Sequence, residues 1–262
     1  MTTKKYLARL LLCVFFFSTG FPAHSQTLDH PTLSETQQKT LDEKLMNTLS
    51  FGPRGDCDLK AVQGLLQQGA SPNARNEDGN TLTALMFAAQ NGCSDIVKLL
   101  LDAGAKVNAK ASNVSAAGAN VLDGITPLFA AASSENAEVV RMLLEHGADL
   151  HAETSDGSIV MLRASTNEIV QIFLDRGLDI NAKDKRGYSL LIRSADAGGH
   201  HRPSIAFLLQ HGADPNAKTN DGTTALKLAK EARGSALLPR THDVELLEKA
   251  GAKQYPEAFP LN

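Results

Sequence analysis

Three histidines are the residues of this sequence that are best suited to hold a metal ion. His200 and His201 are adjacent, and His242 lies further along the chain. Neutral imidazole is a common ligand of zinc and other transition metals, so three imidazoles brought together by the fold would form a metal site. The alternative is that all three are ordinary surface residues, which is the more common role of histidine. We favour this alternative and predict no metal or other cofactor.

The sequence contains none of the usual catalytic patterns. It has no nucleophile elbow, no glycine-rich phosphate loop and no pair of histidines four residues apart beside a glutamate. We therefore predict that the protein is not an enzyme, and we name no catalytic residues.

The N-terminal 25 residues have the pattern of a secretory signal peptide. A basic start precedes an apolar run at residues 10–17, and Ala23 and Ser25 are small residues of the kind that signal peptidase reads. The run is shorter than the roughly 20 residues that a membrane-spanning helix needs. We predict cleavage after Ser25 and a periplasmic or secreted protein, with an uncleaved anchor as the alternative.

The charge of the chain restricts its partners. Removing residues 1–25 leaves 23 basic and 29 acidic residues, so the net charge changes from −3 to about −6. A nucleic-acid-binding protein needs a basic surface, and no later segment is long and apolar enough to span a bilayer. We predict no nucleic-acid partner and no membrane insertion after signal cleavage.

A pattern of helices and turns recurs along the chain. Glycines that follow leucine-rich runs stand at positions 69, 104, 147, 177, 212 and 251. Each of the first five is followed by a triplet like Asn181-Ala182-Lys183 and then by a turn dipeptide like Asp221-Gly222. In the unit at 123–153, Thr126 can cap a first helix, apolar spacing predicts a second helix, and Gly147 can end it. Each unit is therefore predicted to contain a turn, two helices and a glycine stop.

These motifs resemble the ankyrin repeat. The family's Thr-Pro-Leu-His-x-Ala motif appears at 126–131 as Thr-Pro-Leu-Phe-Ala-Ala, and its Leu-Leu-x-x-Gly-Ala-Asp-x-Asn-Ala motif appears at 208–217. The resemblance implies an all-α solenoid of stacked helix-turn-helix units with short β-hairpin-like turn tips. No unit keeps the family's histidine after the leucine, which removes a local hydrogen bond.

The chain is expected to form one repeat array with additional segments at both ends. The predicted segments are a signal peptide at 1–25, an N-terminal helix that caps the array at 26–50, the array at 51–253 and a tail at 254–262. The predicted units are 51–77, 78–110, 123–153, 156–183, 186–218 and 221–253, and the fourth has a shortened first helix or loop. Residues 111–122 are a loop insertion at a turn tip, either tolerated without function or in contact with a partner.

Two cysteines remain once the signal peptide is removed. Cys57 and Cys93 are an even pair in a chain predicted to be exported, where disulfides persist. They lie in the helix-to-helix loops of the first two units, one residue out of register. Equivalent positions of stacked helix pairs are about 10 Å apart, whereas bonded cysteines need Cα atoms within about 7 Å. The offset can close this gap, so we predict a disulfide, with two free thiols as the alternative.

The array is expected to present its turn tips and the ends of its first helices along one groove, which in this family usually binds another protein. The residues predicted to line this groove are Glu77, Asp78, Gln90, Asn91, Ser133, Ser134, Ser155, Lys185, Arg186, Asp196 and Asn220. Together they predict a partner surface of mixed, mildly acidic character. The alternative is a solvated polar face with no single partner.

The leading hypothesis is an exported ankyrin-repeat module for protein–protein interaction, acting as a periplasmic adaptor or protector of another envelope protein. One alternative is a secreted effector or toxin-neutralising binding protein. A second alternative is a metal-binding protein that uses the loop containing His200 and His201. The partner is predicted to be another protein of unknown identity, and the protein itself is expected to be a monomer.

Overall fold

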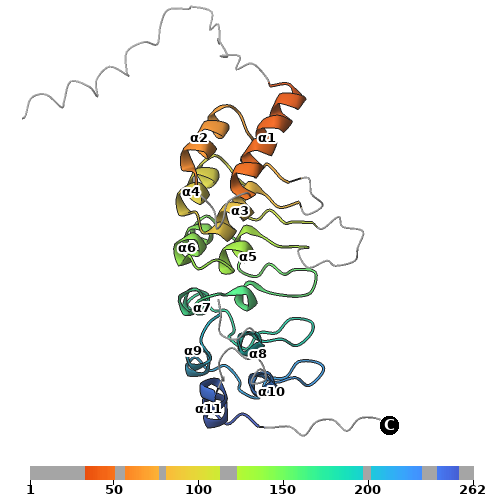
Figure 1. Ribbon diagram of the computed structural model, residues 1–262, viewed down its shortest axis with the longest axis vertical. Coiled ribbons are helices and arrows are strands. Elements are labelled where there is room, and N and C mark those ends of the chain that lie inside the picture. Colours follow the sequence, from red (N-terminus) through yellow and green to blue (C-terminus); the bar gives the residue numbers. More distant parts are fainter. Residues whose placement is uncertain are drawn as a thin grey trace, which may run out of the picture. The chain divides into compact units, whose positions relative to one another are not determined.

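The computed structural model describes residues 33–50, 57–76, 81–112, 123–196, 202–231 and 241–253. These residues form helices that follow one another in pairs, one pair in each repeat unit (Figure 1). In chain order the pairs are α1 (Glu35–Ser50) and α2 (Leu59–Gln67), α3 (Ala84–Asn91) and α4 (Ser94–Asp102), α5 (Pro127–Ala132) and α6 (Ala137–Glu145), η1 (Val160–Arg163) and α7 (Asn167–Leu174), α8 (Leu190–Asp196) and α9 (Ile205–Gln210), and α10 (Ala225–Glu231) and α11 (Thr241–Lys249). None of these described helices has the length and hydropathy that a membrane span requires.

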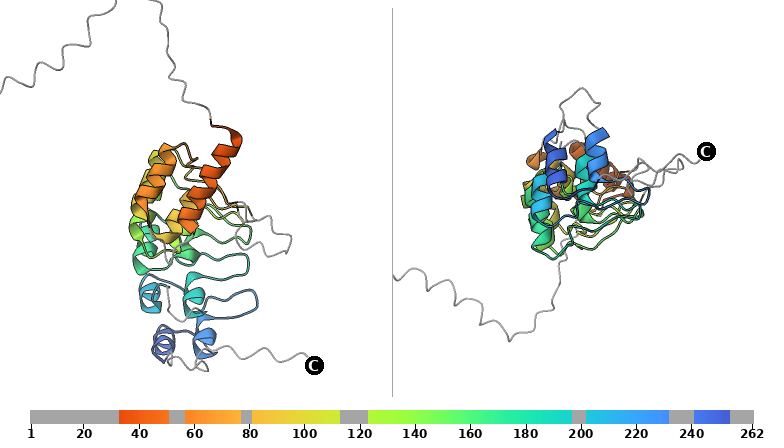
Figure 2. Two further views of the ribbon diagram at one scale, coloured as in Figure 1. Left: turned by 45° about the horizontal axis from the view of Figure 1, so that its top comes forward. Right: turned by 90° about the horizontal axis from the view of Figure 1, so that it is seen from below.

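The helices form two layers. The first-helix layer consists of α1, α3, α5, η1, α8 and α10, which contact one another in chain order. The second-helix layer consists of α2, α4, α6, α7, α9 and α11, with contacts from α2 to α7 and between α9 and α11. Hairpins extend from the first-helix layer on the side away from the second helices (Figures 1 and 2). This arrangement is the all-α solenoid with hairpin-like tips that the sequence predicts.

The two layers use apolar residues differently. α5 has the sequence Pro-Leu-Phe-Ala-Ala-Ala and is buried along its whole length, because it packs between α3, η1 and α6. A helix that is apolar on all sides has to be enclosed in this way. α6 instead buries Val139, Val140 and Leu143 on one face and exposes Glu145. Repeated from unit to unit, this packing forms one continuous core from Leu45 to Leu247.

The first helix pair closes the array with a polar outer face. α1 buries Leu45, Met46 and Leu49, and most of its other residues are exposed. A carboxylate oxygen of Asp42 accepts a hydrogen bond from the backbone N of Ser71 at 2.7 Å, which joins α1 to the end of its own unit. A terminal repeat needs such a polar face because no further unit covers it.

The hairpins are joined to one another as well as within themselves. Isolated antiparallel bridges join Arg75 to Thr83, Glu153 to Ile159, Lys183 to Ser189 and Lys218 to Thr224. Between hairpins, the backbone N of Asn220 donates to the carbonyl oxygen of Arg186 at 2.9 Å. The tips of neighbouring units therefore hold one another in place.

Gly187 shows how closely two tips approach. Its φ is 82°, in the left-handed region that residues with a Cβ rarely adopt. A Cβ added there would lie 2.9 Å from the Cα of Thr219 and from the backbone N of Asn220 in the next tip. Gly212 has a φ of 84°, but an added Cβ would meet nothing within 4 Å. Alanine substitutions at the two glycines can therefore be compared to separate the effect of backbone strain from the effect of close packing.

We expect Gly187→Ala to destabilise the array more than Gly212→Ala does. Both substitutions place alanine in the left-handed region, at a cost of about 1–2 kcal/mol. Only Gly187→Ala also pushes two tips apart, and overpacking of this kind costs about 1–3 kcal/mol more. Urea unfolding followed by circular dichroism measures the loss of unfolding free energy in each variant. Equal losses in the two variants would contradict the close contact between the tips.

Asparagine side chains join consecutive units after their second helices. The Nδ2 of Asn181 donates to the carbonyl oxygen of Gly212 at 3.0 Å, and its Oδ1 accepts from the backbone N of Asp214 at 2.7 Å. The same pair of bonds to the following unit is made by Asn73, Asn108 and Asn216. Each of these hydrogen bonds contributes about 1 kcal/mol net. The bridges also provide a hydrogen-bond donor for the carbonyl group of the glycine that follows each of these second helices.

The junction between the third and fourth units has no such bridge among the described residues. His151 occupies the asparagine position, and its side chain is exposed. The first helix of the fourth unit is also the short 3₁₀ helix η1, which agrees with the predicted shortening. Other polar contacts join these units, among them a hydrogen bond from the hydroxyl of Ser165 to the carbonyl oxygen of Ser134. The backbone N of Ser165 donates to the carbonyl oxygen of Ala132 at 3.0 Å, and Arg141 pairs with Glu168 at 3.0 Å.

We expect His151→Asn to stabilise the protein and the mirror substitution Asn181→His to destabilise it. An asparagine at 151 can make the two missing bonds to the fourth unit, whereas a histidine at 181 removes two existing bonds. Each change should alter the free energy of unfolding by about 1–2 kcal/mol, in opposite directions. Chemical denaturation measures both, and changes of the same sign would contradict the bridging role.

The loop insertion is closed at its base. The backbone N of Ala111 donates to the carbonyl oxygen of Ile125 at 2.8 Å, and the backbone N of Gly124 donates to the carbonyl oxygen of Ala111 at 2.9 Å. The backbone N of Ser112 donates to Oγ1 of Thr81 in the preceding hairpin at 2.9 Å. Residues 113–122 of the insertion lie outside the described residues, as do the predicted signal peptide and the tail at 254–262.

Candidate functional site

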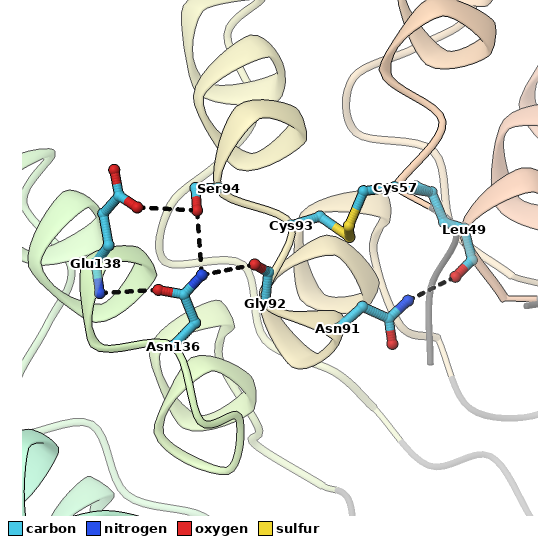
Figure 3. The surroundings of a disulfide bond; sticks show 8 residues. All are labelled: Leu49, Cys57, Asn91, Gly92, Cys93, Ser94, Asn136 and Glu138. Carbon is cyan, nitrogen blue, oxygen red and sulfur yellow. Dashed lines mark hydrogen bonds between the residues drawn. A yellow bond between two sulfur atoms is a disulfide. The ribbon is translucent and has the colours of Figure 1, made fainter. Parts of the chain in front are cut away.

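Cys57 and Cys93 form a disulfide between the first two units (Figure 3). Their Cα atoms are 5.5 Å apart. Cys57 lies directly before Asp58, the N-cap residue of α2, whereas Cys93 is itself the N-cap residue of α4. This offset brings the two cysteines closer than equivalent positions of stacked helices, and the predicted bond is confirmed.

A polar hollow lies next to Cys93, at the C-terminal ends of α3 and α5. We call it the inter-helix hollow; its volume is about 800 Å³ and it is lined by residues 90–92, 133–138, Arg141 and Glu168. Four of the residues predicted to line the groove meet here: Gln90, Asn91, Ser133 and Ser134. The structure therefore brings together the helix-end residues of the second and third units.

Asn136 holds the wall of the inter-helix hollow in place. Its Oδ1 accepts from the backbone N of Glu138 at 3.0 Å and so caps α6. Its Nδ2 donates to the carbonyl oxygen of Gly92 at 2.8 Å and to Oγ of Ser94 at 3.1 Å. Ser94 in turn donates to a carboxylate oxygen of Glu138 at 3.1 Å (Figure 3). One side chain thus caps a helix and also joins the second unit to the third.

Most of the predicted residues in the hollow serve the fold. Asn91 donates to a backbone carbonyl of α1 at 2.9 Å. Ser133 and Ser134 donate to backbone carbonyls of α5 at 3.3 and 2.7 Å, and Ser134 is only 7% exposed. Gln90 is exposed. The hollow therefore offers a partner fewer polar side chains than the sequence pattern suggests.

Four other predicted residues meet at the hairpin tips of the last three units. Nζ of Lys185 donates to the carbonyl oxygen of Ser155 at 2.8 Å. Asn220 donates from its backbone N to Arg186 at 2.9 Å and from its Nδ2 to the carbonyl oxygen of Lys185 at 2.8 Å. In chain order, each hairpin tip comes before the first helix of its unit, whereas the inter-helix hollow is lined by residues at and after the ends of the first helices. The predicted groove residues are thus divided between two places instead of forming one set.

Of the remaining candidate residues, the structure describes Asp196 and His242, and neither belongs to these two groups. Asp196 is an exposed residue at the end of α8. His242 lies in the first turn of α11. In the described ranges, no group of three or more histidine, cysteine or acidic residues could hold a metal ion. Glu77, Asp78, His200 and His201 lie outside the described residues.

Two arginines of the first-helix layer are not among the candidate residues predicted from the sequence. Arg163 in η1 and Arg193 in α8 each stand four residues after the residue that precedes their helix, Ile159 and Ser189. They therefore occupy equivalent positions in adjacent units. Nη2 of Arg193 lies 2.6 Å from a carboxylate oxygen of Asp184. Aligning the units by their helix starts would have revealed this repeated arginine.

Burial and like charge both act on the arginines of this region. The pKa of Arg163 is lowered from its ordinary value first by burial and then by the positive charge of Arg193, while Asp156 acts in the opposite direction. Burial and the charges of Arg193 and Arg163 also lower the pKa of Arg202, and Asp196 opposes them. Since arginine is not deprotonated in proteins, three guanidinium charges share this part of the array.

Charges divide unequally between the two layers in units two to six. The first helices α3, α5, η1, α8 and α10 contain four basic and two acidic residues. The second helices α4, α6, α7, α9 and α11 contain three basic and eight acidic residues. The excess negative charge of these helices thus belongs to the second-helix layer. The first helices of these units, which face the predicted groove, are net basic.

We expect replacement of both Cys57 and Cys93 by serine to destabilise mainly the first helix pair. In the chain-entropy model a bond between residues 36 positions apart stabilises the folded chain by about 4 kcal/mol. Each unit of a repeat array contacts only its neighbours, so the loss should concentrate in α1 and α2. Hydrogen exchange should show lost protection there and unchanged protection in α8–α11. Equal loss along the whole array would contradict this local role.

Comparison with known families agrees with this architecture. Residues 54–154 and 159–238, which make up most of the chain, match the family model described as ankyrin repeats (3 copies). No curated protein matches the chain. Ankyrin repeats are protein–protein interaction modules and typically non-catalytic binding scaffolds. The matched segments, the stacked helix pairs and the hairpin tips together show that this chain belongs to the ankyrin-repeat family.

Proposed function

We propose that this protein is an exported adaptor that binds another envelope protein and protects or positions it. The observation that carries the proposal is the Cys57–Cys93 disulfide. Disulfides persist in the periplasm and outside the cell and are rare in the cytosol. A structural bond of this kind at the first unit therefore favours a protein that folds after export, which fits the signal-like pattern of residues 1–25.

The fold supports a role in binding because its surface is held in place before a partner arrives. The asparagine bridges join most consecutive units, and the tips of the last three units are bonded to one another. A preorganised surface loses little conformational entropy on association. The extended row of tips and first helices is the surface on which arrays of this kind bind partners.

Export is tested by following the full chain in its native host. We expect the protein in the envelope or extracellular fraction, with Gln26 as its first residue and with the peptides containing Cys57 and Cys93 linked in a non-reducing digest. A cytoplasmic chain that keeps residues 1–25 and has two alkylatable thiols would contradict the proposal.

The adaptor role is tested by crosslinking in intact cells, followed by capture of the tagged chain from the envelope fraction. We expect one envelope protein to be enriched in a fixed ratio, and we expect its half-life or activity to fall when the adaptor gene is deleted. A strain with the gene restored is the control. If the only captured protein is a foreign toxin or host target, the protein is instead a neutralising or effector protein.

A further inference from the structure

Four basic side chains and one aromatic ring gather on the hairpin side of the fourth and fifth units. We call this group the basic patch; it consists of Arg163, Lys185, Arg186, Tyr188 and Arg193. The guanidinium carbons of Arg186 and Arg193 lie 5.3 and 5.5 Å from the centre of the Tyr188 ring. Lys185 reaches back to the tip of the fourth unit, and Arg163 interacts electrostatically with Arg193. The patch therefore spans two neighbouring units.

Among the described residues, few of these positive charges have an acidic side chain in contact with them. Arg193 pairs with Asp184. Lys185 donates to a neutral carbonyl oxygen, and Arg186 lies against the ring of Tyr188. Arg163 makes no hydrogen bond or ion pair within the described part of the chain. Three of the four charges thus have no carboxylate in contact with them among the described residues.

The nearby carboxylates are engaged by the hairpins themselves. Asp184 accepts hydrogen bonds from the backbone N atoms of Arg186 and Tyr188 at 2.9 Å each, and its side chain is only 1% exposed. Asp156 accepts bonds from Thr154 and Ser158 in its own tip. Burial alone would raise the pKa of Asp156, but these bonds and the charge of Arg193 lower it overall. The hydrogen bonds of both acids hold the hairpin tips in shape.

We propose that the basic patch binds an acidic segment of the partner protein, whose carboxylates pair with Arg163, Lys185 and Arg186. This inference rests on the proposed binding function and specifies the chemistry of the partner. Guanidinium groups match carboxylates in charge and geometry, and such charge-assisted bonds are stronger than neutral ones. Tyr188 holds two of the cations beside it and so limits the side-chain entropy that is lost on binding.

The charge distribution favours an acidic polypeptide over a nucleic acid. The chain as a whole has a net charge of −3, and the second helices of units two to six carry eight acidic residues. A long polyanion is repelled by such a field once it extends past the patch. A short acidic segment of a protein can pair with the patch without crossing the acidic layer.

The test uses the purified, oxidised protein and a labelled twelve-residue peptide in which glutamate alternates with serine. Fluorescence anisotropy should show binding of this peptide, and the binding should weaken as salt rises, because exposed charges are screened. A peptide of the same length with lysine in place of glutamate should not bind. Equal or tighter binding of the lysine peptide would overturn the proposal.

Variants locate the binding to the patch. Arg163→Gln combined with Arg186→Glu should weaken binding of the glutamate peptide about tenfold, since exposed ion pairs each contribute a factor of about three to five. The matched control is Lys98→Gln with Lys106→Glu, two exposed positions outside the first-helix layer, which changes the net charge by the same amount. The control should weaken binding less than twofold. Equal losses in the two variants would overturn the assignment to the patch. Circular dichroism and thermal unfolding establish that both variants fold.

A labelled twelve-nucleotide single strand of thymidines separates the two kinds of polyanion. Binding of this strand as tight as that of the glutamate peptide, with the same loss in the patch variant, would make the patch a phosphate-binding site and overturn the proposal.

Failure of the proposal about the basic patch can be told apart from failure of the adaptor role. A native partner captured equally by the wild type and the patch variant leaves the adaptor role standing and removes the patch from it.

Discussion

Each helix pair of this protein has to bury its apolar residues against the next pair. α6 has Val139, Val140 and Leu143 on one face, and the cover for that face comes from α5 and from the neighbouring second helices α4 and α7. In such an array stability is approximately a sum of contributions from single units and from the interfaces between neighbours. The structure is therefore governed by how well adjacent units fit, and much less by contacts between distant parts of the chain.

Polar contacts make some of these interfaces stronger than others. Most junctions have a bridging asparagine, and the first junction also has the disulfide between Cys57 and Cys93. The third junction has His151 in place of the asparagine and a 3₁₀ helix where other units have an α-helix. Both ends of the array are thus firmly connected inward. The middle depends more on apolar packing, on the hydrogen bonds of Ser165 to the third unit and on the exposed pair of Arg141 and Glu168.

Much of the fold could be predicted from the sequence because its determinants are local. Thr126 caps a helix and Gly147 takes a left-handed conformation after one, and each of these roles needs only a few neighbouring residues. The site was less predictable because it depends on which side chains the fold itself uses. Ser134 fits the pattern of a groove residue, yet its hydroxyl bonds to its own helix. Arg163 belongs to no recognised motif, and its position matters only once two units are stacked.

The closed base of the insertion has a consequence for how this protein can change over evolution. The hydrogen bonds between Ala111 and its partners Gly124 and Ile125 complete the hairpin before the extra residues begin. Loop closure costs only slowly more as a loop lengthens, and these bonds fix where the chain leaves the hairpin and where it returns. The number of residues beyond that base can therefore change at little entropic cost to the array. The protein possesses, between its second and third units, a position at which new segments can be acquired, exchanged or lost without refolding the scaffold that carries them.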